Sequence, residues 1–197
     1  TVYRARDSKT SQEVALKLLS AELLLDEEVM TRFEREARLM QKMEHPHLVR
    51  VLHVGTHDKL PYFVMQYVEG STLSTLLTEK HRFSLAEAVP ILKQVGAVLT
   101  YVHQQSIVHR DVKPANILIA QKGEVTLLDF GVAKERSSAT TRTGALIGTP
   151  RYMAPELILG QKVDFRADIY SLALVAYEML TGSHPFAADA DVVVMMA

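Results

Sequence analysis

The chain of 197 residues contains no cysteine, few aromatic residues (7%) and almost no net charge (−1 at pH 7). The lack of cysteine excludes disulfide bonds and cysteine-ligated metal sites, and it fits a reducing compartment. A net charge so near zero gives no electrostatic reason to expect nucleic acid or an acidic membrane as a partner. The remaining composition, 48% hydrophobic and 23% charged, is that of an ordinary globular protein.

Long hydrophobic runs are also missing. No apolar stretch approaches the roughly 20 residues that a membrane-spanning helix needs, and no signal-peptide pattern opens the chain. The histidines, which include His45, His47, His53 and His57, lack the helical spacing of metal ligands. We therefore expect neither a membrane segment in this chain nor a zinc site.

The first third of the chain has the pattern of a small sheet with one helix. Residues 1–7 and 13–19 alternate like the two strands of a hairpin, and apolar runs at 48–54 and 62–68 indicate two more strands. Between them, Met30, Phe33, Ala37 and Met40 recur at helical spacing before Pro46. This order predicts an antiparallel sheet that carries one amphipathic helix.

After Gly70 the pattern becomes mainly helical. Ser84 and Glu87 form a capping box for a helix that runs to about residue 105, in which Pro90 predicts a kink or a shifted start. Residues 117–119 and 125–128 are expected to be short buried strands. The segment 167–180 is apolar nearly all round, which predicts a buried central helix.

The most informative stretch runs from His109 to Asn116 and reads HRDVKPAN, with DFG at 129–131 and APE at 154–156. Asp111 can accept the proton of a substrate hydroxyl, and Lys113 can bring a compact positive charge to a transferring phosphate. Asn116 and Asp129 offer the hard oxygen ligands that Mg²⁺ prefers. A single such aspartate would more often cap a loop turn, but the ordered set favours phosphoryl transfer.

On these motifs the chain resembles the catalytic domain of Ser/Thr protein kinases of the bacterial Hanks type. The resemblance implies an α+β, bilobal fold, with a small antiparallel-sheet N-lobe over residues 1–68 and a mainly helical C-lobe over residues 69–197. It also implies a fragment truncated at both ends, because the glycine-rich loop would precede Thr1 and the last helices would follow about Phe186.

The resemblance assigns a nucleotide site to the region between the lobes. Lys17 would hold the α- and β-phosphates with Glu36 as its partner, and Met65 would lie behind the adenine. Backbone groups of the hinge would bond the base, and apolar side chains would sandwich it. The cofactor-binding residues implied in this way are Lys17, Glu36, Val2, Ala15, Met65, Gln66, Val68, Leu118 and Asp129.

Between Asp129 and Glu156 the composition is that of a surface loop, which the resemblance identifies as the activation segment. Thr141 and Thr143 are the preferred phosphate acceptors, and Arg110 would pair with the added phosphate. An unmodified surface loop remains the alternative. Dimerisation for autophosphorylation on residues 137–143 is a further implication of the resemblance.

Supporting roles follow from the same resemblance. Thr149 would brace the catalytic residues Asp111 and Lys113, and Asp168 would hold the backbone of the catalytic loop. Glu156 would lose its usual partner in a shortened chain, so that Arg151 or Arg166 could substitute. An apolar column that links the lobes would consist of Met40, Val51, His109 and Phe130.

The expected function is transfer of the γ-phosphoryl group of ATP, with Mg²⁺ as cofactor, to Ser or Thr hydroxyls of protein substrates. The expected location is cytoplasmic, as in the intracellular part of a membrane-anchored receptor kinase. A pseudokinase or regulatory binding module would share the fold without turnover. A small-molecule phosphotransferase would share the loop of Asp111 and Asn116, although Thr149 and the segment 154–156 speak against it.

Overall fold

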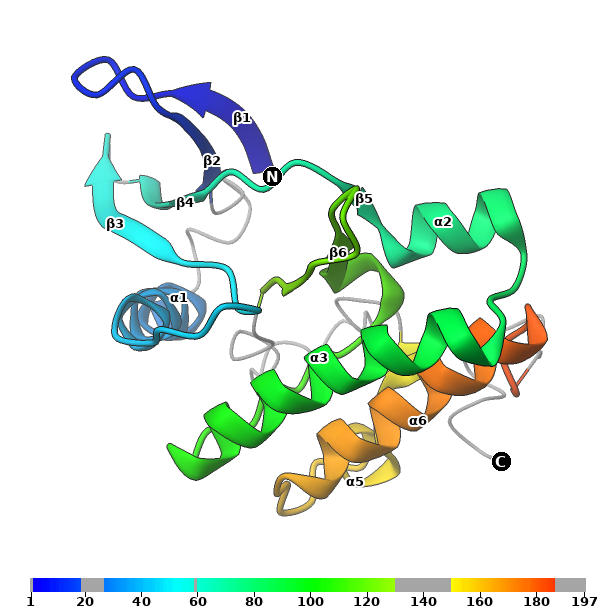
Figure 1. Cartoon of the computed structure of the whole chain (residues 1–197). Coiled ribbons are helices and arrows are strands. Elements are labelled where there is room, and N and C mark those ends of the chain that lie inside the picture. Colours follow the sequence, from blue (N-terminus) through cyan, green and yellow to red (C-terminus); the bar gives the residue numbers. More distant parts are fainter. Residues whose placement is uncertain (1, 19–26, 59, 130–149, 187–197) are drawn as a thin grey trace.

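The computed structural model describes residues 2–18, 27–58, 60–129 and 150–186. In the first part of the chain, four antiparallel strands form one sheet in the order β1-β2-β4-β3, and Figure 1 shows a helix against its face. This arrangement confirms the predicted sheet with one helix. The elements are β1 (Val2–Arg6), β2 (Glu13–Leu18), α1 (Glu27–Gln41), β3 (Val51–His57) and β4 (Leu60–Gln66).

The apolar stripe of α1 packs against the sheet. Phe33, Ala37 and Met40 are 4% exposed or less, as their spacing predicts. Phe63 on β4 is fully buried, and its ring centroid lies 5.1 Å from that of Phe33. Burial of an aromatic side chain of this kind stabilises a fold by about 3–5 kcal/mol relative to alanine.

The third strand begins later than the apolar run at 48–54 suggests. Leu127 donates its amide to His47 O at 2.7 Å and accepts from the Val49 amide at 3.0 Å, so Leu48 forms a parallel bridge with Leu127. The backbone of residues 47–49 is therefore bonded to a distant strand, and β3 starts only at Val51. These hydrogen bonds join the segment just before β3 of the first sheet to Leu127 in the second part of the chain.

The second part is mainly helical and carries a small antiparallel sheet in the order β5-β6-β7. Figure 1 shows its two long helices, α3 and α6, side by side. Its elements are β5 (Ser71–Thr72), α2 (Leu73–Lys80), α3 (Leu85–Gln104), the 3₁₀ turn η2 (Pro114–Asn116), β6 (Ile117–Ile119), β7 (Val125–Leu127), the 3₁₀ turn η4 (Pro150–Tyr152), α5 (Pro155–Ile158) and α6 (Arg166–Thr181).

Helix α3 begins at Leu85 and runs through Pro90, so the shifted start, one of the two outcomes predicted for Pro90, does not occur, and the kink stays a prediction. The Glu87 carboxylate accepts from the Ser84 amide at 2.8 Å, which fixes the first turn before the proline. An ion pair with Lys80 and these Ser84 bonds lower the pKa of Glu87 to about 2. The helix can tolerate the loss of one hydrogen bond at Pro90 because its start is held in this way.

By length and composition α3 is also the one helix of the described residues that could cross a membrane, contrary to the estimate from the sequence. Its side chains at Ala88, Val95, Val98 and Val102 are fully buried in the core, against α6 and the small sheet. That is the arrangement of a core helix in a globular domain.

Helix α6 is central but not buried all round, which corrects the prediction for this segment. Ala167, Asp168, Val175 and Met179 are at most 2% exposed, whereas the opposite face stands open with Ile169 at 54%. Apolar side chains of α6 therefore lie on two faces, one packed in the core and one that the described residues leave uncovered.

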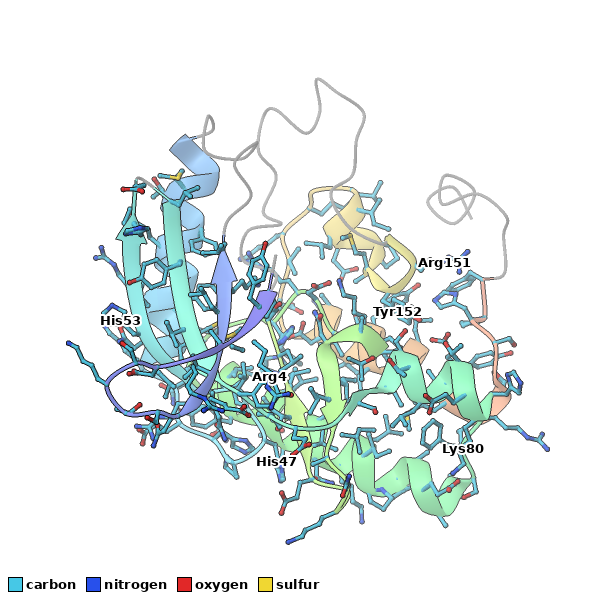
Figure 2. The ribbon with its side chains drawn as sticks, turned by 90° about the horizontal axis from the view of Figure 1, so that it is seen from above. Arg4, His47, His53, Lys80, Arg151 and Tyr152 are labelled. Carbon is cyan, nitrogen blue, oxygen red and sulfur yellow. The ribbon has the colours of Figure 1, made fainter. Side chains whose placement is uncertain are left out.

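The chain passes from β4 to β5 through residues 67–70, where the proposed boundary between the lobes falls. Besides this covalent link, a side-chain hydrogen bond joins the two parts of the fold at His47, labelled in Figure 2. Its Nδ1 is 3.0 Å from Val125 O on β7. Another hydrogen bond joins the Glu44 amide to the Tyr101 hydroxyl on α3 at 3.1 Å. The sheet-bearing and helical parts together confirm the α+β architecture.

Candidate active site

An ion pair joins the two parts of the fold. Lys17 lies on β2, and its Nζ is 2.8 Å from Oδ1 of Asp129, two residues beyond the end of β7. The pair is mostly enclosed, with side-chain exposures of 23% and 26%. Asp129 Oδ1 is buried and makes no hydrogen bond, so the contact is electrostatic without hydrogen-bond geometry. The ammonium also lies 5.2 Å from the centre of the Phe63 ring.

A second cluster lies in the loop between α3 and β6. Oδ2 of Asp111 is 3.0 Å from Lys113 Nζ and accepts from Asn116 Nδ2 at 2.8 Å. Asn116 Nδ2 also donates to the Asp111 carbonyl at 2.9 Å. The short turn η2 carries Asn116 back toward Asp111 because Pro114 fixes the start of the turn. Asp111 is therefore held in one orientation by two cationic or polar donors.

Leu128 connects the two clusters. Its amide donates to the Asn116 carbonyl at 2.8 Å, and its carbonyl lies 3.0 Å from Nε2 of His109. Asp129 follows Leu128 directly, so its backbone adjoins a residue that is bonded to the catalytic loop, residues 109–116. The predicted residues Lys17, Asp111, Asn116 and Asp129 thus belong to one continuous set of contacts.

His109 is a packing residue, as predicted. It is fully buried, and burial lowers its pKa, so the ring is neutral at physiological pH. Nε2 faces the Leu128 carbonyl and therefore carries the hydrogen, while Nδ1 accepts from the Asp111 amide at 3.3 Å. The ring in this way fixes the distance between the catalytic loop and the residue before Asp129.

Asp168 holds the loop backbone, which confirms the prediction for this residue. Its carboxylate is fully buried at the start of α6, where the helix dipole favours negative charge. Oδ2 accepts from the His109 amide and Oδ1 from the Arg110 amide, both at 2.8 Å. Arg110 has a φ of 65°, a left-handed conformation that costs about 1–2 kcal/mol for a residue with a side chain. The two bonds offset that cost.

A third donor to Asp168 was not predicted from the sequence. Nε2 of His103, in the last turn of α3, lies 2.7 Å from Oδ2 of the carboxylate. A histidine six residues before His109 carries no pattern that distinguishes it from any other polar residue near a helix end.

The residues near Asp129 fit a magnesium ion. Both hydrogen bonds of the Asn116 side chain use its nitrogen, so the amide oxygen is the atom left for a ligand role. Asp129 offers a carboxylate, whose buried Oδ1 lies 2.8 Å from the Lys17 ammonium. Among the described residues no three His, Asp or Glu side chains are grouped around a common point. Mg²⁺ commonly binds one or two protein oxygens and completes its shell with phosphate and water.

The residues expected around the base lie on adjoining strands. Ala15 pairs with Met65 across β2 and β4, and Val2 pairs with Lys17 across β1 and β2. Met65 is 5% exposed, whereas Val2 is 51% exposed. The Gln66 amide donates to Arg50 O at 2.9 Å, and the bonds of the Gln66 and Val68 backbone to a base stay a prediction. Leu118 lies on β6, opposite Thr72 of β5.

Several predicted residues lie outside the described part of the chain. They include Thr149, Phe130, and Thr141 and Thr143 within the segment 137–143. Glu36 is in α1, but its side chain is outside the described part, so the Lys17–Glu36 pair stays a prediction. Of the predicted apolar column, Met40, Val51 and His109 are all at most 3% exposed.

The segment after residue 149 is anchored to α6 through Tyr152, labelled in Figure 2. Its hydroxyl donates to Glu178, and its carbonyl lies 2.6 Å from the Ser171 hydroxyl. Burial, followed by the bond to Glu178, raises the pKa of Tyr152. Arg166 pairs with Asp164 at 2.8 Å, and its pKa is raised mainly by Asp164 and to a smaller extent by Glu156, so a partnership of Glu156 with Arg151 or Arg166 stays a prediction.

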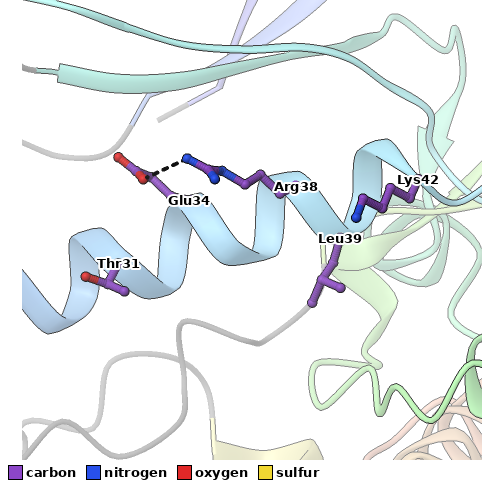
Figure 3. A pocket seen from close by; sticks show the side chains of 5 residues that line it. All are labelled: Thr31, Glu34, Arg38, Leu39 and Lys42. Carbon is purple, nitrogen blue, oxygen red and sulfur yellow. Dashed lines mark ion pairs between the residues drawn. The ribbon is translucent and has the colours of Figure 1, made fainter.

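A separate hollow of about 310 Å³ lies on the outer face of α1 (Figure 3). It is lined by Thr31, Glu34, Arg38, Leu39 and Lys42, and the Glu34 and Arg38 charges pair at 3.6 Å. None of these residues belongs to the clusters around Lys17 and Asp111. The hollow is therefore separate from the residues that would carry the chemistry.

Comparisons with known proteins agree with this geometry. Residues 1–196 match the protein kinase domain family. The chain is 42% identical over 194 residues to a probable serine/threonine-protein kinase of Clostridium perfringens, covering 98% of this chain and 28% of that protein. It is 40% identical over 198 residues to serine/threonine-protein kinase PknB of Mycobacterium tuberculosis (97% and 32% covered). With serine/threonine-protein kinase PrkC of Bacillus subtilis it shares 39% over 192 residues (97% and 30% covered).

The chain spans about a third of the length of these curated relatives. The match extends over both parts of the fold and over the catalytic loop, and it confirms the resemblance identified from the motifs. The chain belongs to the protein kinase domain family and is similar to bacterial Ser/Thr kinases of the Hanks type.

Proposed function

We propose that this domain transfers the γ-phosphoryl group of ATP to Ser or Thr hydroxyls of protein substrates. The observation that supports the proposal is the Lys17–Asp129 ion pair, 2.8 Å long, which joins β2 of the sheet-bearing part to a residue just beyond β7 of the helical part. The pair supplies one cation and one carboxylate, and the loop supplies a second cation, a second carboxylate and one amide, with the Leu128 amide bonded to the Asn116 carbonyl between them. Phosphoryl transfer depends mainly on such positioning and charge neutralisation.

Each side chain has a stated role in the proposal. Asp111 accepts the hydrogen bond of the substrate hydroxyl and takes its proton as the oxygen attacks phosphorus. Lys113 neutralises charge on the transferring group, and Thr149 braces both residues. Lys17 holds the α- and β-phosphates, assisted by Glu36.

Asn116 and Asp129 would hold Mg²⁺, which supplies charge neutralisation at the β- and γ-phosphate oxygens when bound. Carboxylate and amide oxygens suit this ion, and the Lys17 ammonium beside Asp129 adds a second positive group at the same place. The adenine is taken up between Val2, Ala15 and Leu118, with Met65 behind it.

We place this activity in the cytoplasm, because ATP is available there and the lack of cysteine fits a reducing compartment. Protein substrates, including a second copy phosphorylated on residues 137–143, follow from the same activity.

The test is phosphate incorporation by the full-length protein from labelled ATP, with a generic protein and an aminoglycoside as acceptors. We expect label on Ser or Thr of the protein, and a loss of about 10²–10⁴-fold for Asp111→Asn. Transfer to the aminoglycoside alone would indicate a small-molecule phosphotransferase. Nucleotide binding without transfer to either acceptor would indicate a pseudokinase, and undiminished transfer by Asp111→Asn would show that Asp111 is not the base.

A further inference from the structure

We propose that Arg4 is a positioning residue for the nucleotide, because it joins β1 to the connection between the two parts of the fold, residues 67–70. The inference rests on the proposed function for its kinetic consequence. The central guanidinium carbon of Arg4, labelled in Figure 2, lies 4.7 Å from the centre of the Tyr67 ring. Arg4 is on β1 and Tyr67 directly follows β4, so the contact spans the intervening strand β2.

The register of the sheet places Arg4 on the side where the base is expected. Arg4 pairs with Ala15 across β1 and β2, and Ala15 pairs with Met65 across β2 and β4. Directly opposed residues of antiparallel strands share a face, and so do residues two apart on one strand. Arg4 therefore lies on the same face as Val2, Ala15 and Met65, which are proposed to enclose the adenine. Because Val2 is two residues away on the same strand, a contact that holds Arg4 also helps to hold Val2.

Strand β1 is the part of the sheet that gains most from such a contact. Among the described strands it pairs with β2 alone, at the edge of the sheet. Val2 and Tyr3 are each 51% exposed. Segments with few buried apolar contacts open at a low free energy. A contact from β1 to a segment beyond its neighbouring strand restricts this opening.

Glu13 orients the guanidinium. Nη2 of Arg4 donates to both carboxylate oxygens of Glu13, at 2.8 and 2.7 Å. Glu13 raises the pKa of Arg4 most, and Tyr67 and Glu69 raise it further, so the connection is within electrostatic reach of the cation. The ion pair by itself would contribute little, because the Arg4 and Glu13 side chains are 61% and 37% exposed. Its effect is to keep the cation over the ring, where the negative face of the ring attracts it.

The test is a double-mutant cycle on ATP affinity in the full-length protein, with Arg4→Met, Tyr67→Leu and the double variant. Methionine keeps an unbranched stem and removes the cation, whereas leucine removes the ring. We expect each single change to raise the Kd and the KM for ATP by about two- to fivefold, with kcat unchanged within about twofold, because an exposed cation–π contact has this size. The double variant should bind ATP no more weakly than the weaker single variant, because both changes remove the same contact.

Two matched variants separate this contact from a general role of either residue. Tyr67→Phe keeps the ring and should bind ATP within about 1.5-fold of the wild type. Arg6→Met removes the next arginine on the same face of β1, which also pairs with Glu13, at 3.7 Å. This control should leave the affinity for ATP unchanged.

Hydrogen exchange at the β1 amides provides a readout that needs no nucleotide. Exchange should be faster in Arg4→Met and Tyr67→Leu, and near the wild-type rate in Tyr67→Phe and Arg6→Met. Unaltered ATP affinity in both single variants, additive effects in the double variant, or unaltered exchange would each overturn the assignment of Arg4. A wild-type protein that transfers no phosphate would overturn the proposed function, whereas the exchange measurement would still decide whether Arg4 holds the strand.

Discussion

Replacement of Asp168 by asparagine is the perturbation whose size the structure defines best. The carboxylate accepts three hydrogen bonds while fully buried, from His103 Nε2 at 2.7 Å and from the amides of His109 and Arg110 at 2.8 Å. Asparagine has one acceptor oxygen in place of two. If that oxygen takes the Oδ2 position, two bonds survive, and the new NH₂ group faces the Arg110 amide, donor against donor.

The loss of the bond to Arg110 costs about 1.5–3 kcal/mol, since the acceptor was charged, and the two surviving bonds weaken when the charge disappears. Arg110 would then hold its left-handed conformation without support, at about 1–2 kcal/mol. We take about 3 kcal/mol as the total. If this whole cost is added to the activation free energy of the chemical step, kcat falls about 100-fold, because 1.4 kcal/mol corresponds to a factor of ten.

The assay is steady-state phosphorylation by the full-length protein, with hydrogen exchange at the His109 and Arg110 amides measured on the same samples. Asp164→Asn is the matched control, because Asp164 precedes Asp168 by four residues, its side chain is 43% exposed, and its carboxylate bonds to Arg166 in the same turn. It should leave kcat unchanged. A folded Asp168→Asn variant with kcat within threefold of the wild type and unchanged exchange would refute the reasoning.

Three further outcomes follow from the packing. Gly70→Ala should lower the thermal midpoint and weaken ATP binding, because a Cβ at this position would meet Ile119 O at 2.5 Å, and calorimetry measures both effects. Phe63→Ala should cost about 3–5 kcal/mol in a denaturant titration, whereas Phe63→Leu should cost less than half of that. Burial lowers the pKa of His109, so below pH 6.5 the unfolded chain binds a proton that the folded chain does not. The free energy of unfolding should therefore decrease as the pH falls, by up to about 1.4 kcal/mol per pH unit, and His109→Phe should flatten this dependence.

The parts of the site that the sequence predicts are those whose order along the chain is itself informative. Asp111, Lys113 and Asn116 lie within six residues, so their contacts follow from one short loop and the turn at Pro114. Asp168 could be identified because its motif has a known place at the start of a helix. The strands and helices followed from periodicity, which reports local burial directly.

What the sequence did not predict depends on contacts between distant elements. The donor at His103 becomes visible only when α3 and α6 lie side by side, and the late start of β3 depends on the bonds between residues 47–49 and Leu127. The open face of α6 was missed because apolar composition does not say which face is covered. The pairing of Lys17 with Asp129 likewise needed the two parts of the fold to be placed together.

The separate roles of Asp111 as the base and of Asp129 as a ligand of Mg²⁺ are tested most directly in a single-turnover experiment. The full-length protein is loaded with ATP and Mg²⁺, mixed with protein substrate and quenched at set times, after ATP affinity has been measured with and without Mg²⁺. Asp111→Asn should bind nucleotide as the wild type does and transfer phosphate at least about 100-fold more slowly. Asp129→Asn should lose the gain in affinity that Mg²⁺ provides. Wild-type transfer by Asp111→Asn, or unchanged Mg²⁺ dependence in Asp129→Asn, would contradict the account.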